Sequence, residues 1–167
     1  LFQGLTDSTF SRTEGWEFLQ FGKYLERADK TTRILDVKYH ILLPRATDVG
    51  GAVDTAQWQA VLRSTSALEA YRRFYVTEIL PRKVAEFLVL SESFPRSLRY
   101  CLRALEHSLG HIGGERRQSL PPSPAEIDFQ RLRSDLENLS INDIIARGLH
   151  EFLQDAQSVI GRLAASV

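Results

Sequence analysis

One stretch without proline, residues 11–43, constrains the fold most, because its apolar and small residues recur at every third or fourth position. Such spacing places side chains on one face of an α-helix. Ser11 and Glu14 have the spacing of a capping box at its start. The stretch therefore predicts one helix of about 30 residues whose inner face packs in a bundle. The residues on that face are Phe18, Phe21, Leu25, Ala28, Thr32, Leu35, Tyr39 and Leu42.

The rest of the chain repeats the helical pattern in shorter pieces. Loops are predicted at 45–53 and 116–122, and the fourth helix should stop at Gly113-Gly114. Apolar–polar alternation typical of strands is not found in the sequence. We therefore predict an all-α bundle of about six helices with one long N-terminal helix. The five shorter helices are expected to begin at Asp54, Pro81, Pro95, Ser123 and Ser140.

Composition and charge narrow the class of protein. The 167 residues are 43% hydrophobic, which suits a single helical domain over residues 1–167. Lys+Arg and Asp+Glu each number 21, so no overall field favours nucleic acid or an anionic membrane. No run approaches the roughly 18 apolar residues of a membrane span. We expect a cytoplasmic protein with neither nucleic-acid nor membrane partners.

The sulfur-containing residues give two further expectations. The sequence has no methionine, even at position 1, which predicts that the chain is a piece of a longer protein. Its one cysteine, Cys101, follows the apolar pattern of the fourth helix. Such a cysteine is usually a small buried hydrophobe rather than a reactive thiol.

A second stripe on the first helix holds two glycines beside charged residues. A glycine in a helix interior costs about 1 kcal/mol relative to alanine, and it is often retained where a backbone or ligand approaches closely. Two interpretations stay open. Glu26 and Lys30 fit a solvated ladder of i,i+4 ion pairs, or the stripe binds a partner, and then Glu26 and Arg27 should contact groups beyond their own helix. The stripe consists of Gly15, Leu19, Gly22, Glu26, Asp29 and Arg33.

The start of the fourth helix is a second candidate for binding. Exposed backbone amides with Arg96, Ser97, Arg99 and Arg103 have the chemistry of a carboxylate or phosphate site. The alternative is an ordinary helix start whose arginines pair along the surface with Glu106.

Motifs for metal binding and catalysis are weak. His107 and His111 lie four residues apart near Glu106, but no third ligand follows at a fixed spacing. His150 and Glu151 are adjacent, so their side chains diverge on a helix. A phosphate-binding loop and a nucleophile elbow are also missing from the sequence. We therefore predict no metal site, no cofactor and no catalytic residue.

Several ordered blocks of the chain resemble the bacterial alpha-E family, an all-helical domain named for its Glu-Arg motif. The match covers nearly all 167 residues. The blocks are 15–19, 22–29, 32–36, 68–73, 84–88, 94–97 and 148–153, with Glu26-Arg27 as the signature pair. Family members are about twice this length, so the resemblance implies that the chain is the C-terminal half of a longer alpha-E protein.

The resemblance also implies a setting for function. Members of the family are encoded beside, or fused to, circularly permuted ATP-grasp proteins, often with a transglutaminase-like protein. We therefore expect a helical accessory domain, itself non-catalytic, of a system that forms or processes amide or peptide bonds. Its partner would be the ATP-grasp protein, and a transglutaminase-like protein is a second one. The residues expected to bind a partner or ligand are Glu26, Arg27, Arg33, Arg96 and Ser97.

Two alternatives remain. The chain is an enzyme of the same pathway, with Glu26 as acid or base and Arg27 or Arg96 holding an anionic substrate, or it is a scaffold. If a missing half normally packs on the first helix, two copies of the chain could pair there as a homodimer. The aromatic residues that predict this contact are Trp16, Phe18, Phe21, Tyr24 and Tyr39.

Overall fold

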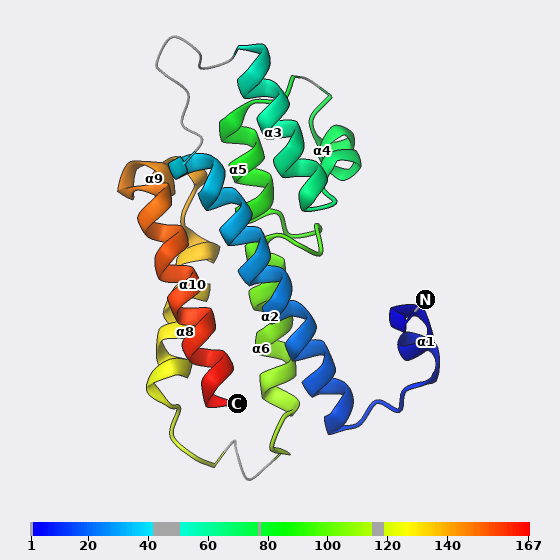
Figure 1. The fold of residues 1–167 in the computed structure, drawn as a ribbon. Helices are drawn as coiled ribbons and strands as arrows, with labels where there is room; N and C mark the ends of the chain where they lie inside the picture. Colours follow the sequence, from blue (N-terminus) through cyan, green and yellow to red (C-terminus); the bar gives the residue numbers. More distant parts are fainter. Residues whose placement is uncertain (1, 42–50, 77, 115–118) are drawn as a thin grey trace.

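Helices account for all the regular structure in the part of the chain that the computed structural model describes (Figure 1). That part comprises residues 2–41, 51–76, 78–114 and 119–167. The all-α prediction is confirmed. Leu42 and most of the loop predicted at 45–53 lie outside the described residues, as do positions 116–118 of the second predicted loop.

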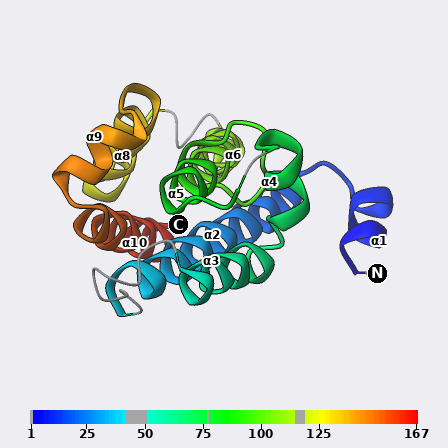
Figure 2. The ribbon, with the colours of Figure 1, turned by 90° about the horizontal axis from the view of Figure 1, so that it is seen from above.

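Helix α2, Glu14–Asp36, is the central element, and it continues into a π-helical turn, η1, at Val37–Ile41. It packs most extensively against α6 and then against α10, with α3 and α5 also in contact (Figure 2). The predicted inner face is largely confirmed, because Phe21, Ala28 and Leu35 are buried. Phe18 differs, since it lies on the solvent side of the helix.

The start of α2 differs from the predicted capping box. Thr13 is the N-cap residue, and its side chain makes no capping hydrogen bond. The Glu14 carboxylate instead accepts a hydrogen bond of 2.8 Å from the backbone N–H of Gly113, just beyond the end of α6. A long-range contact has thus replaced the local one, and it fixes the N-terminus of α2 against the C-terminal end of α6. Upstream, α1 (Phe2–Thr9) lies apart from the bundle in both views (Figures 1 and 2).

The second predicted helix is two helices, α3 (Ala52–Ser64) and α4 (Leu68–Phe74). The chain bends between them at Ser66, whose φ is 55°. The third predicted helix is confirmed as α5, Pro81–Leu90, with its proline in the first turn. The predicted N-cap Asp54 is instead buried inside α3.

Helix α6, Leu98–His111, begins three residues later than predicted. Ser97 is its N-cap, and its Oγ accepts a 3.2 Å hydrogen bond from the backbone N–H of Tyr100. The same hydroxyl donates to the carbonyl oxygen of Ser91 in the preceding turn. Ser97 is therefore fully used in joining α5 to α6.

The C-terminal third holds α8 (Pro124–Asn138), α9 (Ile141–Arg147) and α10 (Leu149–Ser166). The capping box of Ser123 and Glu126 is confirmed, and Ser140 caps α9 as predicted. Gly148, with φ at 99°, breaks the last predicted helix in two. Such breaks, together with α1, explain why nine α-helices are described where about six were predicted.

A polar contact joins the C-terminal end of α2 to the first turn of α10. The ring Nδ1 of His150, in the first turn of α10, lies 2.6 Å from Oδ1 of Asp36 at the end of α2. His150 therefore has a partner from α2 rather than its neighbour Glu151. Among the described residues, no helix is both long and apolar enough to cross a membrane.

Candidate functional site

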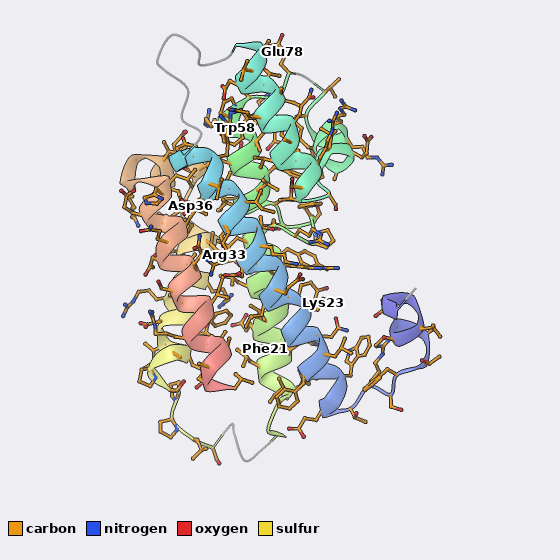
Figure 3. The ribbon with its side chains drawn as sticks, viewed as in Figure 1. Phe21, Lys23, Arg33, Asp36, Trp58 and Glu78 are labelled. Carbon is orange, nitrogen blue, oxygen red and sulfur yellow. The ribbon has the colours of Figure 1, made fainter. Side chains whose placement is uncertain are left out.

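The interface of α2 and α6 is not closed along its whole length. A cavity of about 430 Å³ lies between the N-terminal half of α2 and the face of α6 that runs from Tyr100 in its first turn to Ser108. Figure 3 shows the side chains along α2, with Phe21 and Lys23 labelled at this level of the bundle. The polar residues that line the cavity include Glu17, Gln20 and Tyr24 from α2, and Tyr100, Arg103 and His107 from α6.

Gln20 is the unusual residue of this cavity. Its side chain is only 9% exposed, and its amide Nε2 finds no hydrogen-bond partner within the described residues. An unsatisfied buried amide costs about 1–3 kcal/mol, so such groups are rare without a cause. Gln20 lines the cavity, so a small movement of its side chain would bring this donor to a ligand or an ordered water.

Two tyrosines form the middle of the cavity wall. The rings of Tyr24 and Tyr100 are tilted, with centroids 5.8 Å apart. Burial, reinforced by the neighbouring Tyr100 hydroxyl, raises the pKa of Tyr24 to about 12. Its hydroxyl therefore stays protonated at neutral pH and acts as a hydrogen-bond group rather than as a base.

The arginine of the cavity is already paired. Arg103 donates two hydrogen bonds of 2.8 Å to the carboxylate of Glu137 in α8. Glu92 lies 3.5 Å away on the other side of the guanidinium. These carboxylates raise the pKa of Arg103, and Arg103 in turn lowers the pKa of Glu137. Arg103 therefore holds α6 against α8 instead of serving an anion in the cavity.

Three potential metal ligands meet at the end of the cavity. One ligand atom each from Glu17, His107 and His111 lie within 4.8 Å of one another. Helical spacing predicted that the two histidines share a face of α6. The third ligand could not be read from spacing, because Glu17 belongs to a different helix. Glu106, the acidic neighbour noted in the sequence, instead pairs with Arg133 of α8 at 3.0 Å.

The signature pair of α2 divides between two surfaces. Glu26 is exposed and forms an ion pair with Lys30 one turn along the same helix. Arg27 is half-buried, and it donates a 3.4 Å hydrogen bond to the carbonyl oxygen of Pro95 in the turn before α6. The expectation of contacts beyond α2 is confirmed for Arg27 and wrong for Glu26.

Of the remaining predicted residues, Arg33 lies on the outer surface of α2 with Glu26, whereas Arg96 and Ser97 lie near Arg27. The Nε–H of Arg33 donates a bifurcated hydrogen bond to the two carboxylate oxygens of Asp29. Arg96 and Ser97 lie beside the Pro95 carbonyl that Arg27 contacts, so the structure brings these three residues together at the start of α6. Arg27 and Arg96 both face the thiol of Cys101, yet burial dominates and raises the pKa of that thiol to about 12. Cys101 is a buried, protonated thiol, as predicted.

The glycines of α2 do not serve packing inside the described chain. At Gly22, the position of an added Cβ has no atom within 4 Å. At Gly15, the nearest atom to such a Cβ is on the ring of Phe10 at 3.7 Å, an ordinary contact. The predicted close approach at Gly22 is therefore not made by any described residue.

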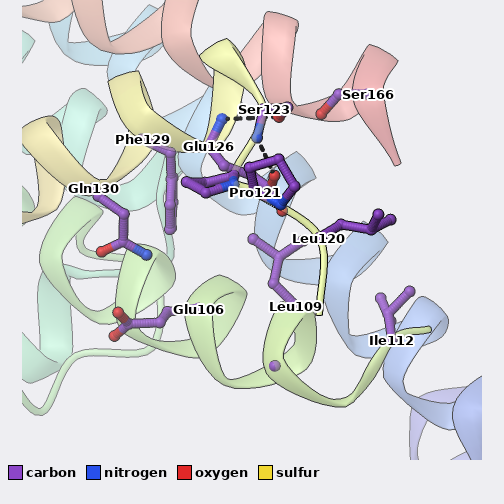
Figure 4. Close-up of a pocket in the computed structure, with 12 residues that line it drawn as sticks. Glu106, Leu109, Ile112, Leu120, Pro121, Ser123, Glu126, Phe129, Gln130 and Ser166 are labelled. Atoms are coloured by element: carbon purple, nitrogen blue, oxygen red, sulfur yellow. Dashed lines mark hydrogen bonds between the residues drawn. The ribbon is translucent and has the colours of Figure 1, made fainter. Parts of the chain in front are cut away.

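A larger cavity, of about 530 Å³, lies between α6, α8 and the end of α10 (Figure 4). Its charged residues are already engaged: Glu106 pairs with Arg133, and the Glu126 carboxylate accepts a hydrogen bond from the backbone N–H of Ser123. The cavity has mainly apolar walls formed by residues such as Leu109 and Phe129. We therefore interpret this cavity as a gap in the packing of the helices and not as a polar binding site.

The fold and these contacts define an all-α domain built around one long helix that carries a Glu-Arg pair. The chain matches, over residues 1–167, the family Alpha-E, described as a predicted alpha-helical domain with a conserved ER motif. It belongs to the Alpha-E family.

Relatives of this chain are found among curated proteins. It is 26% identical to an uncharacterized protein of Mycobacterium bovis and to its counterparts in two strains of Mycobacterium tuberculosis. Each match covers 94% of this chain and 18% of the relative. The chain thus spans about a fifth of the length of these relatives. No solved structure matches it significantly.

Proposed function

We propose that this chain is a helical accessory domain, not itself catalytic, of an ATP-grasp-linked system that forms or processes amide or peptide bonds. In this proposal it binds its ATP-grasp partner through the outer face of α2. The outer face is the exposed side of α2. It overlaps the stripe predicted from the sequence and is formed by Phe18, Gly22, Glu26, Arg33 and Val37.

The observation that carries the proposal is the exposure of this stripe on the most central helix of the bundle. Phe18 at one end is 45% exposed, and Val37 at the other end is 46% exposed. Gly22 lies between them with open space above its backbone. A bare glycine lets a second backbone come close, and a partner helix seated there would also bury the flanking apolar side chains.

The charges on the stripe suit the edge of such an interface. Glu26 pairs with Lys30, and Asp29 pairs with Arg33 at 2.8 Å. Paired charges carry little net field, so they give an interface specificity more than affinity. Beside the stripe, a shallow apolar groove of about 310 Å³ between α2 and α3 extends the surface past Ile34 and Val61.

The enzyme alternative finds less support. It requires Glu26 to work beside Arg27 or Arg96, whereas Glu26 faces outward and pairs with Lys30. Arg27 points toward α6 instead and contacts the Pro95 carbonyl. A general acid must lie within hydrogen-bond reach of the group it serves, and an exposed glutamate in a flat ladder lacks the surroundings that tune a catalytic carboxyl.

The test compares how well the unchanged chain and the Gly22→Leu variant, each purified, capture a circularly permuted ATP-grasp protein from the organism that produces this chain. Leucine at this exposed helical position favours the helix while blocking close approach. Gly161→Leu in α10 is the matched control, since an added Cβ there also has nothing within 4 Å. We expect Gly22→Leu to lose at least about tenfold in affinity, which corresponds to about 1.4 kcal/mol. Equal capture by the Gly22→Leu and Gly161→Leu variants would show that the outer face of α2 is not part of the interface.

A further inference from the structure

Glu17, His107 and His111 are the feature that neither the accessory role nor the family match explains. The two histidines lie one turn apart in the last part of α6, with ring centroids separated by 4.5 Å. Glu17 approaches them from the first turn of α2. Two imidazoles and one carboxylate within 4.8 Å are a donor set that divalent transition metals bind.

We propose that these three side chains form a binding site for a divalent transition-metal ion, and that Zn²⁺ is the ion the donor set fits best. Zn²⁺ takes histidine nitrogen and carboxylate oxygen at about 2.0–2.2 Å, and two histidines with one glutamate are an established set. Ligand atoms around such an ion lie roughly 3.4 Å apart in a tetrahedron. Side-chain rotation closes the difference from 4.8 Å, because His107 and His111 are both exposed.

The hydrogen bond of His111 favours the tautomer that a metal can bind. Its Nδ1 lies 2.7 Å from the backbone carbonyl oxygen of His107. A carbonyl oxygen only accepts, so the Nδ1–H must be the donor. In the neutral ring, Nε2 then carries the lone pair that a metal requires. In metal sites a backbone carbonyl commonly accepts a hydrogen bond from the far nitrogen of a metal-binding histidine, which fixes the orientation of the ring.

The relative position of the two helices is held independently of any metal. The hydrogen bond from the Gly113 backbone N–H to the Glu14 carboxylate joins the end of α6 to the start of α2. Glu14 and Glu17 lie one turn apart on α2, so the same contact keeps Glu17 beside the histidines. Because the two helices are already in place, binding an ion has to order only the three side chains.

The neighbouring charges leave Glu17 available. Arg103 is held by Glu137, and Arg133 is held by Glu106. Glu17 itself makes no ion pair within the described residues. One carboxylate with two neutral imidazoles supplies a single negative charge, which leaves a bound divalent ion with net positive charge.

Gln20 gives the site a fourth component. It lies one turn after Glu17 on the same side of α2 and lines the same cavity. Three protein ligands leave a fourth metal position for water or a small anion. The Nε2 of Gln20 is a buried donor that lacks a partner within the described residues, and an oxygen bound to the metal would give it an acceptor. We infer that the site takes water or a small carboxylate as its fourth ligand.

The experiment is a calorimetric titration of the 167-residue chain with Zn²⁺ near neutral pH, repeated for Glu17→Gln, His107→Ala and His111→Ala. We expect one ion per chain, with affinity lowered by more than about 100-fold in each variant, since even outer-shell changes cost 10–100-fold. Glu26→Gln, an exposed carboxylate on the same helix, and His150→Gln are the controls expected to bind normally. Circular dichroism checks that every variant is folded.

Two results would overturn the site. One is the absence of saturable binding in the unchanged chain. The other is equal affinity in Glu17→Gln and Glu26→Gln, which would leave only a surface histidine pair.

The role of Gln20 is tested on the Co²⁺-loaded chain by visible absorption during a titration with acetate. We expect Gln20→Leu to retain Co²⁺ but to need several-fold more acetate for the same spectral change. An identical response in both proteins would exclude Gln20 from the fourth position.

Discussion

Lys38 and Asp54 form an ion pair that is almost completely enclosed by the protein. The distance from Nζ to Oδ1 is 2.7 Å, and the two side chains are 2% and 3% exposed. Gln57 accepts a second hydrogen bond from Nζ at 2.8 Å. The pair joins the π-helical turn after α2 to α3.

We predict that Lys38→Met destabilises the chain by about 3–5 kcal/mol, because it removes the ammonium group that pairs with the buried Asp54 carboxylate. Lys30→Met is the control, since Lys30 pairs with Glu26 in solvent and its loss should cost under about 0.5 kcal/mol. Urea denaturation measures both. The double change Lys38→Met with Asp54→Leu should recover much of the lost stability, and equal losses in the two single variants would contradict the argument.

Gly148 and Gly161 should respond in opposite directions to alanine. Gly148 has φ at 99°, and a Cβ there would also crowd the Glu151 carboxylate. We expect Gly148→Ala to lower the free energy of unfolding by about 1 kcal/mol or more. Gly161→Ala, in the open face of α10, should raise it by up to about 1 kcal/mol. Thermal unfolding of both variants measures the sign of each change in the free energy of unfolding. Two changes of the same sign would be inconsistent with this backbone geometry.

Acid should weaken the contact between α6 and α8. Hydrogen bonds from Arg103 hold the pKa of Glu137 below its usual value in the folded state. A lowered folded pKa stabilises the protein above the unfolded value of about 4.3 and loses that contribution as the pH falls through the folded pKa. Glu137→Gln should therefore reduce the drop in urea midpoint between neutral pH and about pH 3. A pH profile identical to that of the unchanged chain would show that the pair does not contribute.

Self-association is expected when no partner covers the outer face of α2. Of the five aromatic residues that suggested a homodimer, Phe21 is buried and Phe18 is exposed. We predict a two-fold contact through Phe18 at micromolar concentration, detected by light scattering. Phe18→Ser should give a monomer, whereas Phe74→Ser, which changes an exposed phenylalanine on α4, should not. A strictly monomeric unchanged chain would refute the contact.

Local chemistry in the sequence predicted local structure well. Ser123 and Glu126 form the expected capping box, and Pro81 begins a helix, because both effects depend on residues within one turn. The failures occur where a distant group competes. The Glu14 carboxylate accepts a hydrogen bond from the backbone N–H of Gly113 instead of forming a capping box with Ser11. Asp54 forms a buried ion pair with Lys38 instead of capping its helix.

The same limit explains what was missed in the candidate sites. Helical periodicity places His107 and His111 on one face, yet it cannot bring Glu17 to them, since that depends on how α2 and α6 pack. It also could not separate Glu26 from Arg27. Adjacent residues on a helix point about 100° apart, and only the position of Pro95 shows which of the two meets the rest of the protein.

The packing of α2 against α10 has a consequence during synthesis. The groups that cover α2 belong largely to α6 and α10, so its apolar face stays uncovered while most of the chain is still being translated. At about 5–20 residues per second, the delay between α2 and α10 is on the order of ten seconds. A nascent chain in this state is a natural client for ribosome-associated chaperones, and truncation before α10 should yield aggregates instead of a smaller folded unit.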